Sequence, residues 1–580
     1  MQTQARPHQG LGTFLVRLWR LARPYWFAED RWAARGLFAV VLALTIGGVW
    51  LEVLFNSWNN EFYNALQEKN EPEFWKQFGV FGWLAVLFIA NFVATRYFSL
   101  WLQIRWREWL TKRYVDGWLS GRVYYRFQVT GAETDNPDQR IAEDVKLFVS
   151  TTLGLVTQLI NAVLTLAAFL TILWGLSGDF TLTLFGTEIA IPGYMVWFAI
   201  VYSVVGTWLT HKVGKPLVPL NYAQQRYEAD FRFALVRLRE NAEQVALYGG
   251  EGRERANFLA RFAGVAANWY ALMLAGLKLN LFTSLFGQLA IVFPFIVAAP
   301  RYFSGAMQLG GLMQTASAFG QVQGALSFFV QAYAQLADWK SVVDRLLDFE
   351  TAVAKAEADA KVAPLVEEAS ADGALAIENV DVGLPGGATL IAGATARVAP
   401  GARILLTGDS GTGKSTLFRV LAGIWPFGRG RVRAPARAGF LFLPQKPYMP
   451  IGSLREALLY PHDGGADDET LRRTLDDVRL PALKDRLDEI AHWGQRLSPG
   501  EQQRLAVGRA LLAKPAFLFL DEATAALDEA TEAHVYALLA ERLPQTAIVS
   551  IGHRPALKAF HSAFWHVTRQ PDGPAKLAVA

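Results

Sequence analysis

Two kinds of hydrophobic pattern divide the chain near residue 345. Before that point, six apolar runs are long enough to cross a hydrocarbon core of ~30 Å, which takes about 20 helical residues. They cover roughly 35–55, 76–98, 148–176, 191–211, 279–299 and 309–333. Beyond it, short apolar strands alternate with helical patterns, as in soluble α/β proteins. The pattern therefore predicts a membrane-embedded part followed by a soluble part.

The charges between the apolar runs predict the orientation of the membrane part. The connection 56–75 carries four glutamates and no arginine, whereas the long connections 99–147 and 212–278 are rich in arginine. Positive charge stays on the cytoplasmic side of a membrane. We therefore expect both termini inside, and 56–75, 177–190 and 300–308 outside. Buried helices of a large soluble protein are the alternative, which this alternation of loop charge disfavours.

The N-terminal stretch predicts an interfacial helix. Arg6, Arg17, Arg20 and Arg23 surround a short amphipathic segment, and no small-residue cleavage site follows an apolar core. These features indicate an elbow helix at the cytoplasmic membrane surface rather than a signal peptide.

Three of the apolar runs carry polar residues at helical spacing. The stripes are Gln158, Asn161 and Thr165; Asn280, Ser284 and Gln288; and Gln314, Ser317 and Gln321. Polar groups face lipid only at a high cost in free energy. Two interpretations stay open: hydrogen bonds between helices, and a water-filled translocation cavity, which three stripes on three helices favour.

Composition narrows the possible functions. The chain of 580 residues is 52% hydrophobic and only 19% charged, which is unusual for a soluble protein. It contains no cysteine, which excludes disulfides, thiolate catalysis and Cys-ligated metal sites. The net charge of +4 is small for this length, and we expect no nucleic-acid partner.

A phosphate-binding loop lies at the start of the soluble part. An apolar strand at 403–407 leads into GDSGTGKS and then into a helical pattern, the context that this loop requires. Its glycines let backbone N–H groups face phosphate oxygens, while Lys414 supplies charge to the β- and γ-phosphates and the Ser415 hydroxyl ligates Mg²⁺. The expected nucleotide-binding residues are Gly408, Asp409, Ser410, Gly411, Thr412, Gly413, Lys414, Ser415 and Thr416.

Four further polar residues follow predicted strands. Asp521 and Glu522 end the strand 516–522, where Asp521 is placed to bind Mg²⁺ through water and Glu522 to polarise the attacking water. Gln445 follows the strand 439–443 and is expected to contact Mg²⁺ and the γ-phosphate; His553 follows the strand 547–551 and is expected to contact the γ-phosphate. A single glutamine or histidine at such a place would usually have a structural role. The order of Gln445 and His553 around Lys414 and Asp521 favours a catalytic role instead.

The remaining motifs resemble those of ABC ATPases. LSPGEQQR at 497–504 resembles the signature motif LSGGQ, and ATAALD at 523–528 resembles the D-loop. With the motifs above, the resemblance covers 375–580. It implies that Ser498 and Gly500 contact ATP held by a second copy of the chain, so that the functional unit is a homodimer using ATP and Mg²⁺.

The sequence departs from the ABC pattern at three places. Pro499 replaces a signature glycine and removes one backbone N–H. Glu501 replaces the signature glutamine and brings negative charge towards the triphosphate, which is expected to slow closure. The aromatic residue that stacks on adenine is missing from 380–390.

Four motifs in the first half resemble the bacterial SbmA/BacA and YddA-like branch of ABC transporters, and also the peroxisomal ABCD transporters. They are EFYNALQ (61–67), IRWREWLT (104–111), DNPDQRIAEDV (135–145) and ENAEQVALYGGE (240–251). The resemblance implies a bacterial inner-membrane protein. It also implies that the last motif transmits ATPase closure to the membrane helices.

The sequence thus predicts a multidomain protein with an all-α six-helix transmembrane bundle of the ABC exporter type and an α/β P-loop NTPase domain of ABC type. The expected regions are 1–34 with the elbow helix, a transmembrane domain at 35–345, a linker at 346–372 acting as helix tail and tether, and the nucleotide-binding domain at 373–580.

The expected function is ATP-driven transport of peptides or other bulky hydrophilic compounds, such as cobalamin or bleomycin-like molecules. Two alternatives remain open: a proton-coupled carrier or channel with a regulatory ATPase domain, and an ABCD-like transporter of fatty acyl compounds. A soluble ABC ATPase acting on DNA or ribosomes is excluded by the six apolar runs.

Overall fold

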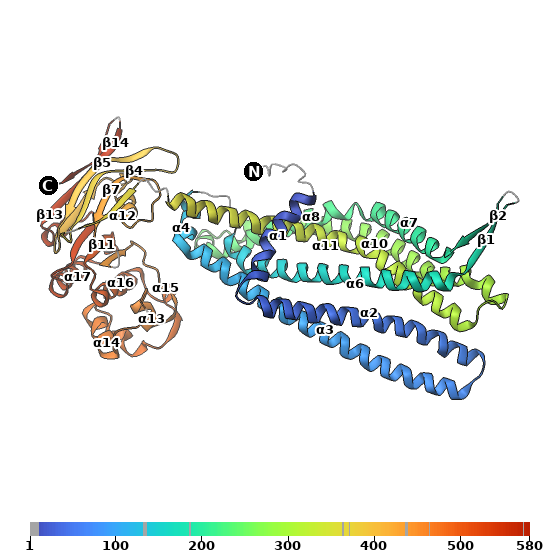
Figure 1. The fold of residues 1–580 in the computed structure, drawn as a ribbon. Helices are drawn as coiled ribbons and strands as arrows, with labels where there is room; N and C mark the ends of the chain where they lie inside the picture. Colours follow the sequence, from blue (N-terminus) through green and yellow to red (C-terminus); the bar gives the residue numbers. More distant parts are fainter. Residues whose placement is uncertain are drawn as a thin grey trace. The chain divides into compact units, whose positions relative to one another are not determined.

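The computed structural model of the chain forms two compact units (Figure 1). One unit comprises Met1–Tyr114 and Asn136–Asp348, and the other Val115–Asp135 and Phe349–Ala580. The structure describes residues 11–130, 136–184, 187–361, 365–370, 372–435, 439–462, 464–571 and 573–579. Arg6, expected in the elbow region, lies outside these residues.

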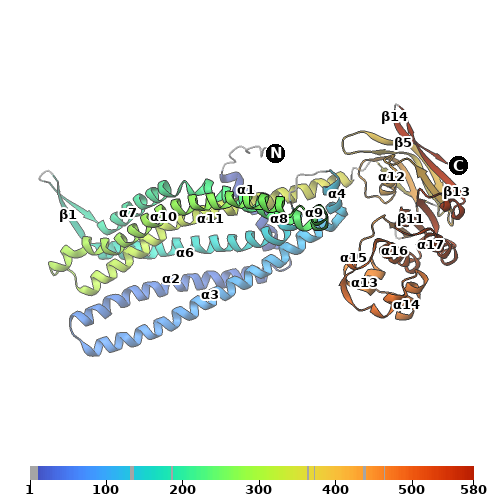
Figure 2. The same ribbon diagram turned by 180° about the vertical axis from the view of Figure 1, so that it is seen from behind.

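Long helices build the first unit (Figures 1 and 2). They are α1 (Leu11–Phe27), α2 (Arg31–Gln67), α3 (Glu71–Leu119), α6 (Val145–Ser177), α7 (Tyr194–Gly214), α8 (Leu217–Glu240), α9 (Ala242–Tyr248), α10 (Glu251–Phe303) and α11 (Leu309–Lys361). The 53 residues of α10 measure about 80 Å at ~1.5 Å per residue, far more than a bilayer core. This helix therefore extends well beyond the membrane.

Four helical segments are long and apolar enough to span a membrane. These are Arg31–Gln67, Glu71–Thr130, Pro137–Ser177 and Glu251–Phe303, and they contain four of the six predicted spans. The other two predicted spans, 191–211 and 309–333, fall largely on α7 and α11, which do not meet the same criterion. Helices thus form where apolar runs were predicted, and the membrane crossing of α7 and α11 stays a prediction.

The helix ends that were predicted to lie outside meet one another. Gln308 Nε2 donates to Glu68 Oε1 at 3.1 Å, and the Leu309 N–H donates to Gln67 Oε1 at 2.6 Å. The α2–α3 connection and the α10–α11 connection therefore lie at the same end of the unit, in agreement with the predicted topology.

A β-hairpin between α6 and α7 was not predicted. Strands β1 (Asp179–Leu184) and β2 (Thr187–Pro192) pair antiparallel along their whole length. The sequence TLTL…TEIAI does alternate with the period of a strand. The predicted outer connection 177–190 therefore contains most of a β-hairpin.

The motif at 135–145 forms an ion cluster with α11. Arg345 holds Asp144 through two hydrogen bonds of 2.9 and 2.7 Å, and Arg140 adds a third of 2.7 Å. Burial alone raises the pKa of the Asp144 carboxyl, but the hydrogen bonds from Arg345 and Arg140 outweigh it and the net pKa is lowered. The motif at 135–145 therefore has a structural role: it fixes α11 to the start of α6.

The second unit is built on a ten-stranded sheet. Its strand order is β3-β7-β4-β5-β14-β13-β6-β12-β11-β8. The strands are β3 (Leu365–Ala369), β4 (Leu375–Gly383), β5 (Thr389–Val398), β6 (Arg403–Gly408), β7 (Gly428–Ala434), β8 (Phe440–Leu443), β11 (Phe517–Asp521), β12 (Ala547–Ile551), β13 (Ala563–Gln570) and β14 (Gly573–Val579). Strands β6, β12, β11 and β8 are parallel, whereas β4 pairs antiparallel with β5 and β7. The predicted α/β fold is confirmed.

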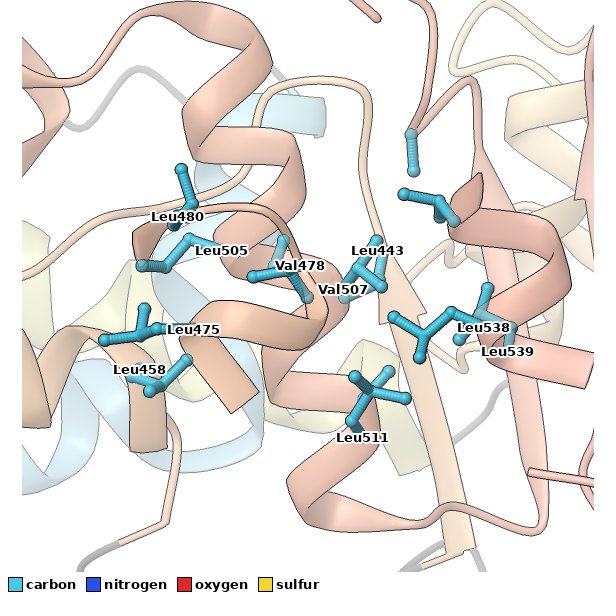
Figure 3. Packing of buried hydrophobic residues seen from close by; sticks show 14 of the residues in the cluster. Leu443, Leu458, Leu475, Val478, Leu480, Leu505, Val507, Leu511, Leu538 and Leu539 are labelled. Atoms are coloured by element: carbon cyan, nitrogen blue, oxygen red, sulfur yellow. The ribbon is translucent and has the colours of Figure 1, made fainter. Parts of the chain in front are cut away.

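A leucine-rich core joins the helices of this unit to the sheet (Figure 3). The helices in this core are α13 (Leu454–Leu459), α14 (Asp468–Asp477), α16 (Pro499–Ala513) and α17 (Glu529–Arg542), whereas α12 (Lys414–Leu421) packs in a second cluster with β4, β5 and β6. Leu458, Leu475 and Leu505 are fully buried where α13, α14 and α16 meet. This packing fixes the start of α16, which carries the signature motif.

The predicted tether is wrong at 365–369. Helix α11 continues to Lys361, and β3 then pairs in parallel with β7 over five residues. Arg433 and Arg431 on β7 form ion pairs with Glu368 at 2.9 and 3.2 Å. The charged composition that suggested a solvated tether belongs instead to an edge strand.

A short helical segment from the first half of the chain belongs to this second unit. Arg122 Nη1 donates to the Ala422 carbonyl at 2.9 Å, at the C-terminal end of α12. In α4 (Val123–Thr130), Phe127 packs edge-to-face on Phe349 with ring centroids 6.1 Å apart. The segment thus contacts both the helix that follows the phosphate loop and the end of α11.

The topology can be tested by labelling, because the chain has no native cysteine. A cysteine replacing Glu68 should react with a membrane-impermeant maleimide in intact cells. Glu251→Cys, exposed at the start of α10, is the matched control and should react only after permeabilisation. Labelling of Glu68→Cys only in permeabilised cells would reverse the predicted orientation.

Candidate functional site

The site lies at one edge of the sheet, where four parallel strands end. Strands β8 and β12 flank β11 in register, with Leu443 beside Leu520 and Ile551 beside Asp521, and β6 flanks β12. Polar residues that follow parallel strands meet at their carboxyl ends. The phosphate loop, Gln445, Glu522 and His553 each follow one of these strands.

The glycines of the phosphate loop adopt conformations that other residues rarely take. Gly408 has φ 142° and Gly413 has φ 98°. A Cβ at Gly408 would lie 2.4 Å from the Val567 carbonyl oxygen, so no side chain fits there. The loop leads directly into α12, and the free N–H groups in the first turn of a helix favour an anion such as phosphate.

Lys414 lies folded into the loop. Its Nζ donates to the carbonyls of Gly408 and Asp409 at 2.7 and 2.8 Å, and burial lowers its pKa. Thr412 Oγ1 braces the same turn by donating to Asp409 O at 2.9 Å. A partly desolvated ammonium gains most from an anionic partner, which fits a polyphosphate.

Ser415 and Asp521 come together from positions 106 residues apart. Ser415 Oγ donates to Asp521 Oδ1 at 2.8 Å. Burial raises the pKa of Asp521, the neighbouring charge of Glu522 raises it further, and the Ser415 hydrogen bond opposes both. A hydroxyl and a half-buried carboxylate are oxygen ligands suited to a hard divalent cation. The pair therefore fits the predicted Mg²⁺ site.

Glu522 joins the other two predicted catalytic residues. Gln445 Nε2 donates to Glu522 Oε2 at 2.9 Å, and His553 Nε2 lies 3.4 Å from Glu522 Oε1. The Glu522 backbone has φ 49°, an unusual value that is held by its N–H donating to Ile551 O at 3.2 Å. A half-buried carboxylate thus lies between an exposed amide and an exposed imidazole, a group able to orient a water molecule.

Two residues that the sequence analysis missed hold these loops in place. Buried Gln503 donates to the Gln445 carbonyl at 2.9 Å and accepts from the Ala526 N–H at 3.0 Å, so it links the glutamine loop to the D-loop. Arg554, next to His553, donates to Leu527 O at 2.7 Å. Neither position carries a spacing signal, although Gln503 lies inside the signature run.

The signature motif starts helix α16. Ser498 is the N-cap, and Pro499 occupies the first helical position, where a backbone N–H has no helical partner in any case. The proline therefore costs no intrahelical hydrogen bond. Gly500 lies close to the D-loop, since a Cβ there would be 3.2 Å from Ala526 O, a tighter contact than most side chains make.

Glu501 binds the signature serine of its own chain. One carboxylate oxygen, Oε2, accepts from both the N–H and the hydroxyl of Ser498 at 2.8 Å, completing a capping box. The serine hydroxyl is thereby directed at a carboxylate.

Aliphatic residues lie beside the phosphate loop where an aromatic residue was expected. The β4–β5 turn, 384–388, contains no aromatic ring, and Ile391 and Leu390 approach Gly413, with 3.3 and 3.4 Å to a Cβ built there. A flat aliphatic surface can support a base, with less stacking energy than an aromatic ring.

Taken together, the phosphate loop, the Glu522 cluster and the signature helix define an ATP-binding domain of the ABC class, fused to a helical membrane unit. Comparison with known families agrees: "ABC transporter transmembrane region 2" matches residues 21–303, and "ABC transporter" matches residues 391–525.

The relatives cover nearly the whole chain. It is 34% identical to the inner membrane ABC transporter ATP-binding protein YddA of Escherichia coli over 93% of this chain and 94% of that protein. It is 30% identical to the lysosomal cobalamin transporter ABCD4 of Mus musculus over 81% and 82%. A bacterial Atm1-family ABC exporter with ATP bound shares the fold, with a TM-score of 0.71, 18% identity and coverage of 93% and 94%. The chain belongs to the ABC transporters, as a fused half-transporter homologous to YddA and the ABCD family, and it couples ATP hydrolysis to transport.

The bridging role of Gln503 can be separated from its contribution to stability. Gln503→Leu leaves a buried carbonyl and a buried N–H without partners, which is expected to cost about 1–3 kcal/mol in the free energy of unfolding. It should also lower ATPase activity by about 10- to 100-fold, because small displacements of catalytic groups are costly. Thermal unfolding and ATP turnover of the purified full-length protein measure the two effects.

Thr546→Val is the matched control. Its buried hydroxyl donates to Pro515 O at 2.6 Å, at the opposite end of β12 from the site. It should lower stability without a comparable loss of turnover. An equal loss of activity in both variants would show that Gln503 acts only through stability.

Proposed function

We propose that the protein is a homodimeric ATP-driven transporter of bulky hydrophilic compounds in the bacterial inner membrane, with its termini and ATPase domains in the cytoplasm. The arrangement of Glu522 between Gln445 and His553 carries this proposal, because a regulatory nucleotide-binding domain has no need of an assembled hydrolytic centre.

Each predicted residue receives a role in ATP hydrolysis. The backbone of the loop from Gly408 to Thr416 and the Lys414 ammonium bind the phosphates. Glu522 orients and polarises the attacking water, and His553 and Gln445 contact the γ-phosphate. Mg²⁺, held by Ser415, Asp521 and Gln445, would neutralise charge on the β- and γ-phosphates.

A second copy of the chain completes the site. In this proposal Ser498 and Gly500 of one subunit contact ATP bound to the other, and closure of the two ATPase domains drives the membrane helices. The fold shared with an ATP-bound exporter supports this. The name of the mouse relative, a cobalamin transporter, supports a large polar solute rather than a fatty acyl chain.

The first test is Glu522→Gln, which keeps size and hydrogen bonding but removes the charge that activates water. ATP turnover should fall about 10²–10⁴-fold, the usual contribution of a general base. ATP binding should persist, because Lys414, Ser415 and Asp521 remain. Asp521→Asn is the contrasting variant and should weaken Mg²⁺–ATP binding itself.

Measurement of substrate flux distinguishes an ATP-driven pump from a proton-coupled carrier with a regulatory ATPase domain. In proteoliposomes, transport by the Glu522→Gln variant should stop together with turnover. If substrate still crosses at the parent rate under a proton gradient, the ATPase domain is regulatory and the pump is excluded.

The second test concerns the altered signature. In Glu501→Gln the side chain can still complete the capping box but no longer brings a negative charge to the triphosphate. We expect ATP turnover to rise about fivefold, corresponding to roughly 1 kcal/mol of repulsion removed from the closed dimer.

The chain provides a close control for this variant. Ser453 and Glu456 form the same capping box at the start of α13, outside the signature. Glu456→Gln should match any change in helix stability and leave turnover unaltered. A lower turnover in Glu501→Gln would mean that the carboxylate helps to position Ser498.

A further inference from the structure

A cavity in the membrane unit contains a carboxylate that the predicted stripes did not include. Its volume is about 550 Å³, and residues of α2, α3, α6 and α11 line it. Its polar lining includes three further threonines besides Glu52, Asn91, Gln158, Asn161, Thr165 and Gln321, and the rest is small, aliphatic or aromatic. The stripe on α6 and one residue of the α11 stripe therefore face a common space.

Hydrogen bonds between helices explain one member of the α11 stripe but not the cavity. Buried Gln314 accepts from Asn60 Nδ2 at 2.9 Å through its side chain and from Asn56 Nδ2 at 3.0 Å through its carbonyl. In contrast, Glu52 Oε2 and Thr165 Oγ1 are buried without a hydrogen-bond partner among the described residues. Unpaired polar atoms at membrane depth are costly, and an ionisable one most of all. The two atoms line a site that requires a polar occupant.

A second cavity of about 250 Å³ adjoins the first. The two share Phe92, Thr95, Thr157 and Gln158 in their linings, and the second adds Arg96. Among the described lining residues of both cavities, Glu52 is the only acidic side chain and Arg96 the only basic one. Neither has an ion-pair partner in the described part of the chain. The two adjoining cavities together therefore contain one acidic and one basic side chain.

The helix register separates these two charges along the bundle. Gly48 of α2 faces Asn91 of α3, whose Oδ1 lies 3.3 Å from a Cβ built on the glycine. Helices α2 and α3 run in opposite directions, so Glu52 is four residues from this level towards one end and Arg96 five residues towards the other. At ~1.5 Å per residue, the two backbone positions are about 13 Å apart.

We propose that the two cavities form one binding tract for a zwitterionic solute, with its ammonium group at Glu52 and its carboxylate at Arg96. This rests on the proposed transport function and specifies its substrate class. A peptide with free ends spans about 3.3–3.6 Å per extended residue, so three to five residues match the separation of the charges. Each end of the ligand neutralises a side chain that otherwise lacks a counter-charge.

Equilibrium binding of tetra-alanine to the full-length protein in nanodiscs tests the proposal without ATP. The probes are the free peptide, its N-acetyl form, its C-terminal amide and the doubly blocked form. N-acetylation should weaken binding to the parent protein about 10- to 100-fold, as expected for loss of a charge-assisted hydrogen bond, and amidation should do the same.

The variants assign each end of the ligand to a residue. Glu52→Gln should abolish the penalty for N-acetylation and keep the penalty for amidation, whereas Arg96→Gln should do the reverse. Glu52→Asp retains the charge and should retain the N-acetylation penalty, so a folded protein with the expected preference is available even if the glutamine variant is unstable. Glu61→Gln is the matched control: it lies on the same helix outside both cavities and should behave as the parent.

Two results would overturn the proposal. One is a parent protein that binds no probe, or binds free and blocked peptides equally. The other is a Glu52→Gln variant that still discriminates against the acetylated end. Neither result affects the ATPase assays above, and failure of ATP-driven flux with intact end-group selectivity would reject only the proposed pump.

Discussion

The parallel register of four strands is the constraint on which the ATP site depends. Strands β6, β12, β11 and β8 run side by side in one direction, so whatever follows each strand must emerge at the same edge. That is how Ser415 meets Asp521 across 106 positions of sequence, and how Gln445 reaches Glu522 across 77. Each strand is mostly apolar, and a polar residue follows within two positions of its end: Asp409, Gln445, Glu522 and His553. The chemistry is therefore specified wherever the hydrophobic pattern stops.

The same constraint explains which parts of the site could be predicted. Glu522 and His553 stand within two residues of the ends of recognisable strands, Lys414 lies in a recognisable motif after another, and the neighbours of these strands in the sheet follow from the fold class. Gln503 and Arg554 act through contacts with backbone groups of loops, which leave no trace in spacing or periodicity. The sequence showed that Pro499 removes a backbone N–H. Its position in the first turn of α16 means that no intrahelical hydrogen bond is lost. Local rules thus fail where a residue's partner is set by tertiary packing.

In the membrane unit, periodicity predicted helices and polar faces but not what each face meets. Gln314 and Gln321 belong to one stripe, yet one is used in contacts with α2 and the other lines the cavity. Glu52 was missed because a single acidic residue in an apolar run has no period to detect. The hairpin β1–β2 shows the converse case, in which a strand pattern was present but a loop was assumed. Strand β3 was not predicted, because a charged edge strand resembles a tether in composition.

The contact of Arg122 with Ala422 places a guanidinium at one end of α12, while the phosphate loop occupies the other. This helix is eight residues long, or about 12 Å, and its aligned peptide dipoles favour an anion at the first end and a cation at the second. Triphosphate charge and the arginine therefore polarise the same row of peptide groups in the same sense. A bound nucleotide and the hydrogen bond from Arg122 therefore each favour the other through the dipole of α12. This electrostatic coupling requires no displacement of the helix.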